Sequence, residues 1–306
     1  MRSLIQPQPG TSAATPAENL QGAVLMCVAM AFFTMNDTVM KYVAQDLPLY
    51  QSIALRGLAI LPILAIFARR EGGLDLRVQR ENRWPMVLRT VGEVASTVLF
   101  LNALTHMAIS ELSAILQSLP LLVTLAAAVM FGEQLGWRRM LAILIGLAGV
   151  MLILRPGSDA FDIWSVVGVG AVAALVLRDM ATRMFSRAIR SSSIAFYAAL
   201  SVTAAALVLS LGEGWRMPTL AQAGLLILAA MFLTIGYVTV IATMRVGEIG
   251  FVAPFRYVSL VVTIVLGLLV FGEWPDMWTW IGSALVVGAG VYTILRERRL
   301  TRQGRL

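Results

Sequence analysis

Near its middle the chain reads LPLLVTLAAAVMFGEQLGWRRMLAILIGLAGVMLILR (residues 119–155), and near its end it reads SLVVTIVLGLLVFGEWPDMWTWIGSALVVGAGVYTILR (residues 259–296). In both stretches an apolar run ends in Phe-Gly-Glu, a tryptophan follows, and a second apolar run closes with Leu-Arg. Gly149-Val150 and Gly290-Val291 lie in register in the second runs. Agreement at several positions indicates an internal duplication. The alternative is that small residues and helix-ending turns recur through packing needs alone.

The composition is that of a membrane protein. Of the 306 residues, 58% are hydrophobic and 13% are charged, whereas soluble proteins contain about 45–50% apolar and about 25% charged residues. The mean hydropathy is +0.81. These values exclude a disordered chain, a fibre and a water-soluble enzyme. The net charge of +7 does not indicate a nucleic-acid partner, because the basic residues border apolar runs and form no stripe with aromatic neighbours.

Ten apolar runs are long enough, or nearly so, to cross a bilayer as helices. They lie at residues 20–43, 49–67, 84–105, 112–130, 140–154, 163–180, 194–211, 220–243, 250–270 and 278–295. Strands of a membrane barrel would be about ten residues long with strict alternation. The runs are longer and continuous, so the sequence predicts helices.

The distribution of basic residues predicts the orientation. If the N-terminus is cytoplasmic, 17 of the 24 Lys and Arg residues lie in cytoplasmic segments, and only Arg155 and Arg216 lie in loops on the other side. Both ends are then cytoplasmic, which requires an even number of spans. We expect a multi-pass protein of the bacterial inner membrane.

A repeat of five spans, an odd number, inserts its second copy upside down. We therefore expect an all-α integral membrane fold, in which ten transmembrane helices form two inverted five-helix repeats around a central cavity. The predicted parts are a polar N-terminal tail (1–19), the two repeats (20–156 and 157–296) and a basic cytoplasmic tail (297–306).

Ten spans, two five-helix halves and a Phe-Gly-Glu motif closing the fourth helix of each half resemble the EamA branch of the drug/metabolite transporter superfamily. The resemblance covers about residues 20–296. It implies a helical bundle around a central cavity, and transport without ATP hydrolysis. The stretch Asn-Asp-x3-Lys-Tyr at residues 36–42 is similar to the sub-branch that holds the riboflavin and S-adenosylmethionine uptake proteins.

Ionisable side chains inside a span cost roughly 2.5–3.5 kcal/mol on insertion scales, so they are expected to face a wet cavity or one another. Asp37 and Lys41 are four residues apart and can pair, with snorkelling of Lys41 to the interface as the alternative. Asn36 projects about 100° away from Asp37, which predicts that the two do not share a role. Arg56 can clamp a carboxylate or phosphate, or pair with Asp37.

Arg89 and Glu93 form a second i,i+4 pair, with Glu93 about one turn deeper in its span. Gln117 aligns with Tyr257 when the Phe-Gly-Glu motifs are superposed, and Arg256 is adjacent. A tyrosine and an arginine at mid-membrane suit an aromatic or anionic cargo. The candidate substrate-binding residues are Asp37, Arg56, Glu93, Gln117, Arg256 and Tyr257. Glu93 and Asp37 are the candidate carriers of a coupling proton.

The sequence favours a secondary transporter that works by alternating access, with uptake of riboflavin or a similar heteroaromatic nutrient. An amino-acid or metabolite exporter of the same family is the alternative. A membrane-embedded enzyme is a less favoured alternative, because the sequence has no cluster of carboxylates or histidines at either membrane interface. With one histidine, one cysteine and no phosphate-binding loop, we expect no catalytic residue, metal or cofactor. The expected partners are a small-molecule substrate and the lipid bilayer; whether two copies form a homodimer is left open.

Overall fold

The computed structural model describes residues 15–70, 73, 80–132, 136–157, 161–184, 191–246 and 249–302. Within these ranges the regular structure is helical, and ten segments are long and apolar enough to cross a bilayer, as the sequence predicted. Eight of these spans are single helices: α1 (Pro16–Val43), α2 (Leu49–Arg70), α3 (Arg80–His106), α6 (Trp137–Leu154), α7 (Ile163–Arg183), α8 (Ser191–Ser210), α9 (Leu220–Val246) and α12 (Met277–Arg302).

The fourth and ninth spans are broken. The fourth consists of α4 (Ile109–Leu116) and α5 (Leu119–Phe131). The ninth consists of α10 (Ile249–Val252), the 3₁₀ turn η1 (Ala253–Tyr257), α11 (Val258–Leu266) and the π-helical turn η2 (Gly267–Phe271). Pro120 and Pro254 explain the breaks, because proline lacks the N–H donor and its ring clashes with the carbonyl group four residues earlier. Irregular backbone therefore lies within two corresponding spans, where the apolar runs alone predicted continuous helices.

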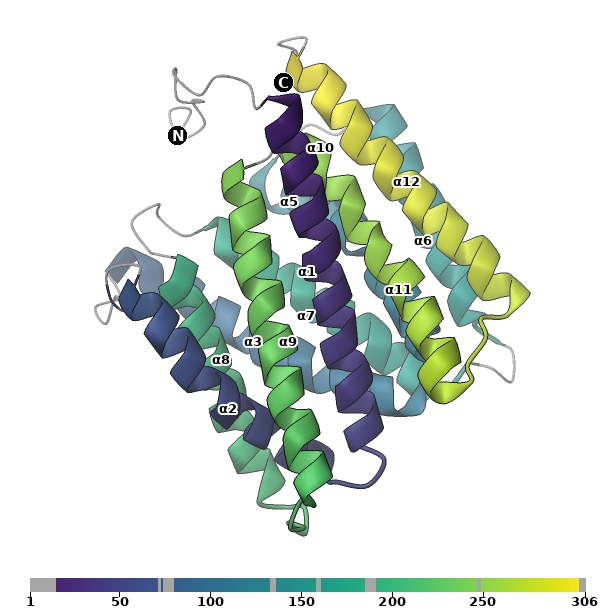
Figure 1. Ribbon diagram of the computed structural model, residues 1–306. Helices are drawn as coiled ribbons and strands as arrows, with labels where there is room; N and C mark the ends of the chain where they lie inside the picture. The colour runs from purple at the N-terminus through teal and green to yellow at the C-terminus, as the bar shows by residue number, and fades with distance from the viewer. Residues whose placement is uncertain are drawn as a thin grey trace.

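The two halves of the chain pack mainly on each other. The most extensive contacts join α1 to α9, α3 to α7, α2 to α8 and α6 to α12. α1 and α7 are the first spans of their halves, and α3 and α9 are the third. The contact of α1 with α9 therefore corresponds to the contact of α7 with α3 when the halves are exchanged. The exchange leaves the other two pairs unchanged. The α2 and α8 pair and the α6 and α12 pair lie at opposite edges of the bundle (Figure 1).

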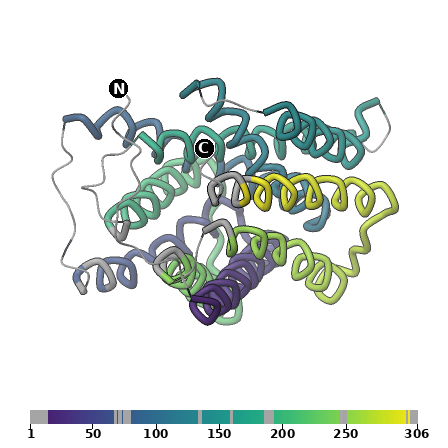
Figure 2. Tube along the Cα trace, turned by 90° about the horizontal axis from the view of Figure 1, so that it is seen from above, coloured from purple at the N-terminus to yellow at the C-terminus, as the bar shows by residue number. Residues whose placement is uncertain are grey.

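The positions of the two ends of the described chain are those expected for an even number of spans. α1 begins and α12 ends at the same end of the bundle (Figure 1). Viewed from above, the yellow α12 runs beside the teal α6 on one side of the bundle (Figure 2). There its backbone approaches that of α6 closely, because a Cβ atom on Gly149 would lie 2.7 Å from the carbonyl oxygen of Gly282. Glycine permits this contact, as is common between membrane helices.

The outer surface of the bundle is strongly apolar. Large side chains such as Val129, Leu209 and Leu269 are exposed, whereas Met40 and Leu104 are fully buried. A soluble monomer rarely exposes so much contiguous apolar surface. Together with the ten spans, this surface identifies a multi-pass membrane protein.

Candidate functional site

A cavity of about 190 Å³ lies within the bundle, lined by residues of α1, α2, α3, α4, α7, α8 and α9. Both halves of the chain therefore contribute to its wall. The charged residues in the lining are Asp37, Arg56, Glu93 and Arg178. Phe100 and Tyr237 add aromatic surface. Three of the six predicted substrate-binding residues, Asp37, Arg56 and Glu93, thus meet at one cavity.

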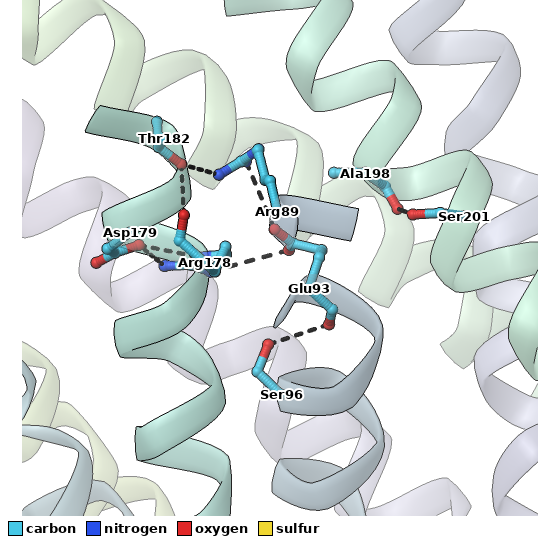
Figure 3. A network of polar contacts seen from close by, with 8 residues as sticks. All are labelled: Arg89, Glu93, Ser96, Arg178, Asp179, Thr182, Ala198 and Ser201. Atoms are coloured by element: carbon cyan, nitrogen blue, oxygen red, sulfur yellow. Dashed lines mark hydrogen bonds and ion pairs between the residues drawn. The ribbon is translucent and has the colours of Figure 1, made fainter. Parts of the chain in front are cut away.

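Glu93 lies between two arginines (Figure 3). Its Oε2 atom is 3.5 Å from Nη2 of Arg89, one turn away on α3, and its Oε1 atom is 3.9 Å from Nη1 of Arg178 on α7. Arg178 also binds Asp179, with Nε and Nη2 at 2.9 Å and 2.8 Å from Oδ1. Arg89 donates to the hydroxyl of Thr182. These contacts join the first half of the chain to the second at the cavity wall.

A glycine brings α3 and α7 close enough for this cluster. A Cβ atom on Gly92 would lie 2.8 Å from the backbone nitrogen of Arg178. Any side chain at position 92 would push the two helices apart, because real Cβ atoms essentially never approach so closely. The neighbouring residue, Glu93, therefore reaches Arg178 across the tightest part of the helix pair.

The second charged group links α1 to α2 through an amide. Nη1 of Arg56 donates to Oδ1 of Asn36 at 3.0 Å, and Nδ2 of Asn36 donates to Oδ1 of Asp37 at 2.9 Å. The side chains of Asn36 and Asp37 are therefore in contact, although the sequence predicted that they point in different directions. A rotation of 100° per residue separates the Cβ directions, but an amide side chain is long enough to reach its neighbour's carboxylate. Nε of Arg56 is buried without a hydrogen-bond partner among the described residues.

Lys41 does not pair with Asp37 but joins α1 to the second half of the chain. Its Nζ atom forms an ion pair with Oε1 of Glu273 at 2.5 Å and donates to the carbonyl of Met107 at 2.8 Å. Oε2 of Glu273 accepts a hydrogen bond from the backbone nitrogen of Ile109, the first residue of α4, at 2.8 Å. The glutamate of the second Phe-Gly-Glu motif thus binds two elements of the first half. Glu133, its counterpart, lies outside the described residues.

A second ion pair also joins the two halves of the chain. Arg155 pairs with Asp276, and its Nη2 atom is 3.9 Å from Oε1 of Glu111. Burial acts to raise the pKa of Asp276, but the hydrogen bond from the backbone N–H of Thr279 and the pairing with Arg155 outweigh it and hold the pKa below its usual value. The stabilisation from this contact is therefore present at neutral pH and is lost as the pH falls through that lowered pKa.

We expect Glu273→Gln to lower the free energy of unfolding by about 1–2 kcal/mol, because the ion pair with Lys41 is lost while the acceptor for Ile109 can remain. Chemical denaturation in detergent measures this loss. The matched control is the pair of variants Lys41→Met and Lys41→Met/Glu273→Gln. If Glu273→Gln destabilises the Lys41→Met background as much as it destabilises the wild type, the two residues are not coupled.

The other three predicted residues lie elsewhere. Gln117 ends α4, and its Nε2 atom donates to the hydroxyl of Ser259 at 2.9 Å. Tyr257, at the end of η1, packs on Gly290 of α12, and its buried hydroxyl has no hydrogen-bond partner among the described residues. Arg256 precedes it and is half-buried. None of the three belongs to the described lining of the cavity. They lie at the breaks of the fourth and ninth spans.

The sequence argument missed two residues of the cavity wall. Tyr237, on α9, lies against Phe33 with the ring centroids 5.5 Å apart and the planes at 78°. A tyrosine inside an otherwise apolar run is a signal that could have identified it. Arg178 lies in the sixth apolar run, at a depth where a charged side chain requires a partner, and this position is the signal that could have identified it.

Comparison with known proteins agrees with the fold. The description "EamA-like transporter family" belongs to the family model that matches residues 20–155 and 162–296. The chain is therefore a non-enzymatic membrane transporter. It belongs to the EamA-like transporter family.

Three relatives show the range of names in the family. The riboflavin transporter of Vibrio cholerae is 29% identical over 294 residues, which cover 94% of this chain and 97% of that protein. The S-adenosylmethionine uptake transporter of Rickettsia bellii is 22% identical, with coverage of 86% and 90%. The pseudopaline exporter CntI of Pseudomonas aeruginosa is 25% identical, with coverage of 88% and 95%. A solved crystal structure with 20% identity shares the fold, with a TM-score of 0.64 and coverage of 91% and 98%.

Proposed function

We propose that the protein is a secondary transporter that takes up a small heteroaromatic metabolite, of which riboflavin is the leading candidate. The observation that carries this proposal is the cavity between the halves, which combines four charged residues with Phe100 and Tyr237. Charged groups can bind the polar part of such a cargo, and aromatic rings can stack on its flat part. Curated relatives named riboflavin transporter match 94% and 95% of this chain, which supports the choice of cargo.

Transport by alternating access follows from two halves inserted in opposite directions. The exchange of helix pairs between the halves supports this arrangement, with repeats at residues 20–156 and 157–296. The placement of basic residues supports cytoplasmic ends in a bacterial inner membrane. In this orientation the contact of Lys41 with Glu273 lies toward the outer end of the bundle.

The cavity is smaller than a cargo of riboflavin's size needs. Sites for ligands of drug size measure about 300–1,000 Å³, whereas this cavity measures about 190 Å³. A cargo of riboflavin's size therefore requires the halves to move apart. We assign Gln117, Arg256 and Tyr257 to the crossing of the two broken spans, which must bend during that movement.

We assign the coupling proton to Asp37. Protonation of Glu93 would break ion pairs with two arginines, whereas protonation of Asp37 would disturb a hydrogen bond with the neutral amide of Asn36. Asn36 then passes the change in charge to Arg56, which lines the cavity. Glu93 keeps Arg178 in position at the opposite wall.

Uptake by reconstituted vesicles tests the proposal. We expect labelled riboflavin to accumulate when a proton gradient is imposed, and to exchange with unlabelled riboflavin without one. A panel with S-adenosylmethionine and amino acids serves as the comparison. Accumulation of another compound, with no exchange of riboflavin, would assign a different cargo to the same site.

An exporter of a metabolite is the second candidate, favoured by the similarity to the pseudopaline exporter. Growth of a riboflavin auxotroph at low riboflavin separates the two. Rescue by this protein supports uptake, whereas resistance to a toxic metabolite without rescue supports export.

A further inference from the structure

Residues of α6 and α12 line a groove of about 410 Å³. These two helices lie at the edge of the bundle away from α2 and α8 (Figure 1). The lining of the groove comes from the first turns of α6 and from residues 288–292 of α12, so the beginning of α6 lies beside the middle of α12. Ala142 and Ala289 form its buried floor. The groove shares no lining residue with the charged cavity.

The groove is open because small residues line it. A Cβ atom on Gly288 would meet no other atom within 4 Å. Leu141 and Ile145 form apolar walls and are 49% and 42% exposed. Since this face of the bundle meets the lipid bilayer, a hydrocarbon chain fits the groove and water does not.

The rim at one end of the groove is basic and aromatic. The guanidinium group of Arg138 lies over the ring of Trp137, 5.2 Å from its centroid. Across the groove, Nη1 of Arg296 donates to the hydroxyl of Tyr292 at 3.3 Å. None of the described lining residues is acidic. Tryptophan and tyrosine mark the headgroup region of a membrane, and arginine binds phosphate in a bidentate manner.

We propose that this groove is a binding site for an anionic phospholipid, with an acyl chain between α6 and α12 and the headgroup phosphate at Arg138 and Arg296. A basic pocket between transmembrane helices is typical of such sites. A zwitterionic lipid fits less well, because its ammonium group would face the arginines. A second copy of the chain is a less suitable occupant of the groove. A two-fold interface would bring the arginines of the two copies together, and their like charges would repel.

Native mass spectrometry of the full-length protein, released from a non-ionic detergent, tests this site. The probes are phosphatidylglycerol and phosphatidylcholine with identical acyl chains. Gly288→Leu fills the groove where space is open, and Arg138→Gln removes one phosphate ligand. Gly224→Leu on α9 is the matched control, because a Cβ atom there also meets nothing within 4 Å.

We expect the wild type and Gly224→Leu to bind phosphatidylglycerol with the same dissociation constant. Gly288→Leu and Arg138→Gln should weaken it about tenfold. Phosphatidylcholine should bind weakly and alike to all four proteins. Equal binding of the two lipids by the wild type, or unchanged phosphatidylglycerol binding by Gly288→Leu, would overturn the proposal. A wild-type dimer that Gly288→Leu converts to a monomer without loss of lipid would instead identify an interface between copies.

Discussion

Asp37→Asn is expected to abolish accumulation of cargo driven by a proton gradient and to leave exchange of cargo across the membrane intact. Asparagine has nearly the same shape as aspartate, so the hydrogen bond to Asn36 and the cavity wall can persist. It cannot bind or release a proton, so the cycle loses its coupling while the movement of the halves continues. Reconstituted vesicles measure both activities on one preparation.

Two comparisons make this result specific. Asn36→Asp is the matched control, because it alters the adjacent link to Arg56 and leaves Asp37 able to titrate. Glu93→Gln tests the other predicted carrier, and we expect it to reduce exchange and accumulation together. Full accumulation by Asp37→Asn would remove Asp37 from the coupling step.

Glu93→Ala is expected to have the largest effect on stability, a loss of about 3–5 kcal/mol in the free energy of unfolding. The reason is that removal of Glu93 leaves the half-buried Arg89 without a carboxylate partner and leaves Arg178 with Asp179 alone. The contact also joins α3 to α7, so cargo binding should be lost as well. Denaturation in detergent measures the first effect, and binding of labelled cargo measures the second.

The double variant Glu93→Ala/Arg178→Ala distinguishes a coupled pair from two independent residues. We expect it to be more stable than the sum of the single changes predicts, because it removes a cation together with the carboxylate that this cation faces. Additive losses would show that Glu93 and Arg178 do not stabilise each other. Glu93→Asp keeps the charge on a shorter side chain and should recover part of the stability.

The sequence predicted the number of spans because each span carries its own signal, an apolar run bounded by polar residues. Proline breaks within spans were not predicted, since Pro120 and Pro254 lie inside runs that remain apolar throughout. The breaks also explain why Gln117 and Tyr257 do not reach the cavity. An alignment of the Phe-Gly-Glu motifs gives their level in the membrane, but the direction of a side chain depends on the local twist of the helix.

The sequence placed three charged residues within spans, and their depth alone predicts that they face a cavity or a partner. These residues, Asp37, Arg56 and Glu93, lie on three spans, and all of them line the cavity. Which partner each residue takes was not predictable from spacing. Lys41 binds Glu273, which is 232 positions away in the chain, instead of the carboxylate four positions before it.

The mutual packing of the halves has a consequence for biosynthesis. Glu93 enters the bilayer while Arg178, which follows 85 residues later in the sequence, is still unmade. Until α7 arrives, only Arg89 can accompany that carboxylate, and α1 likewise waits for α9. Native assembly must therefore occur after insertion, and the ribosome has to deliver nearly the whole chain before the nascent protein can become stable.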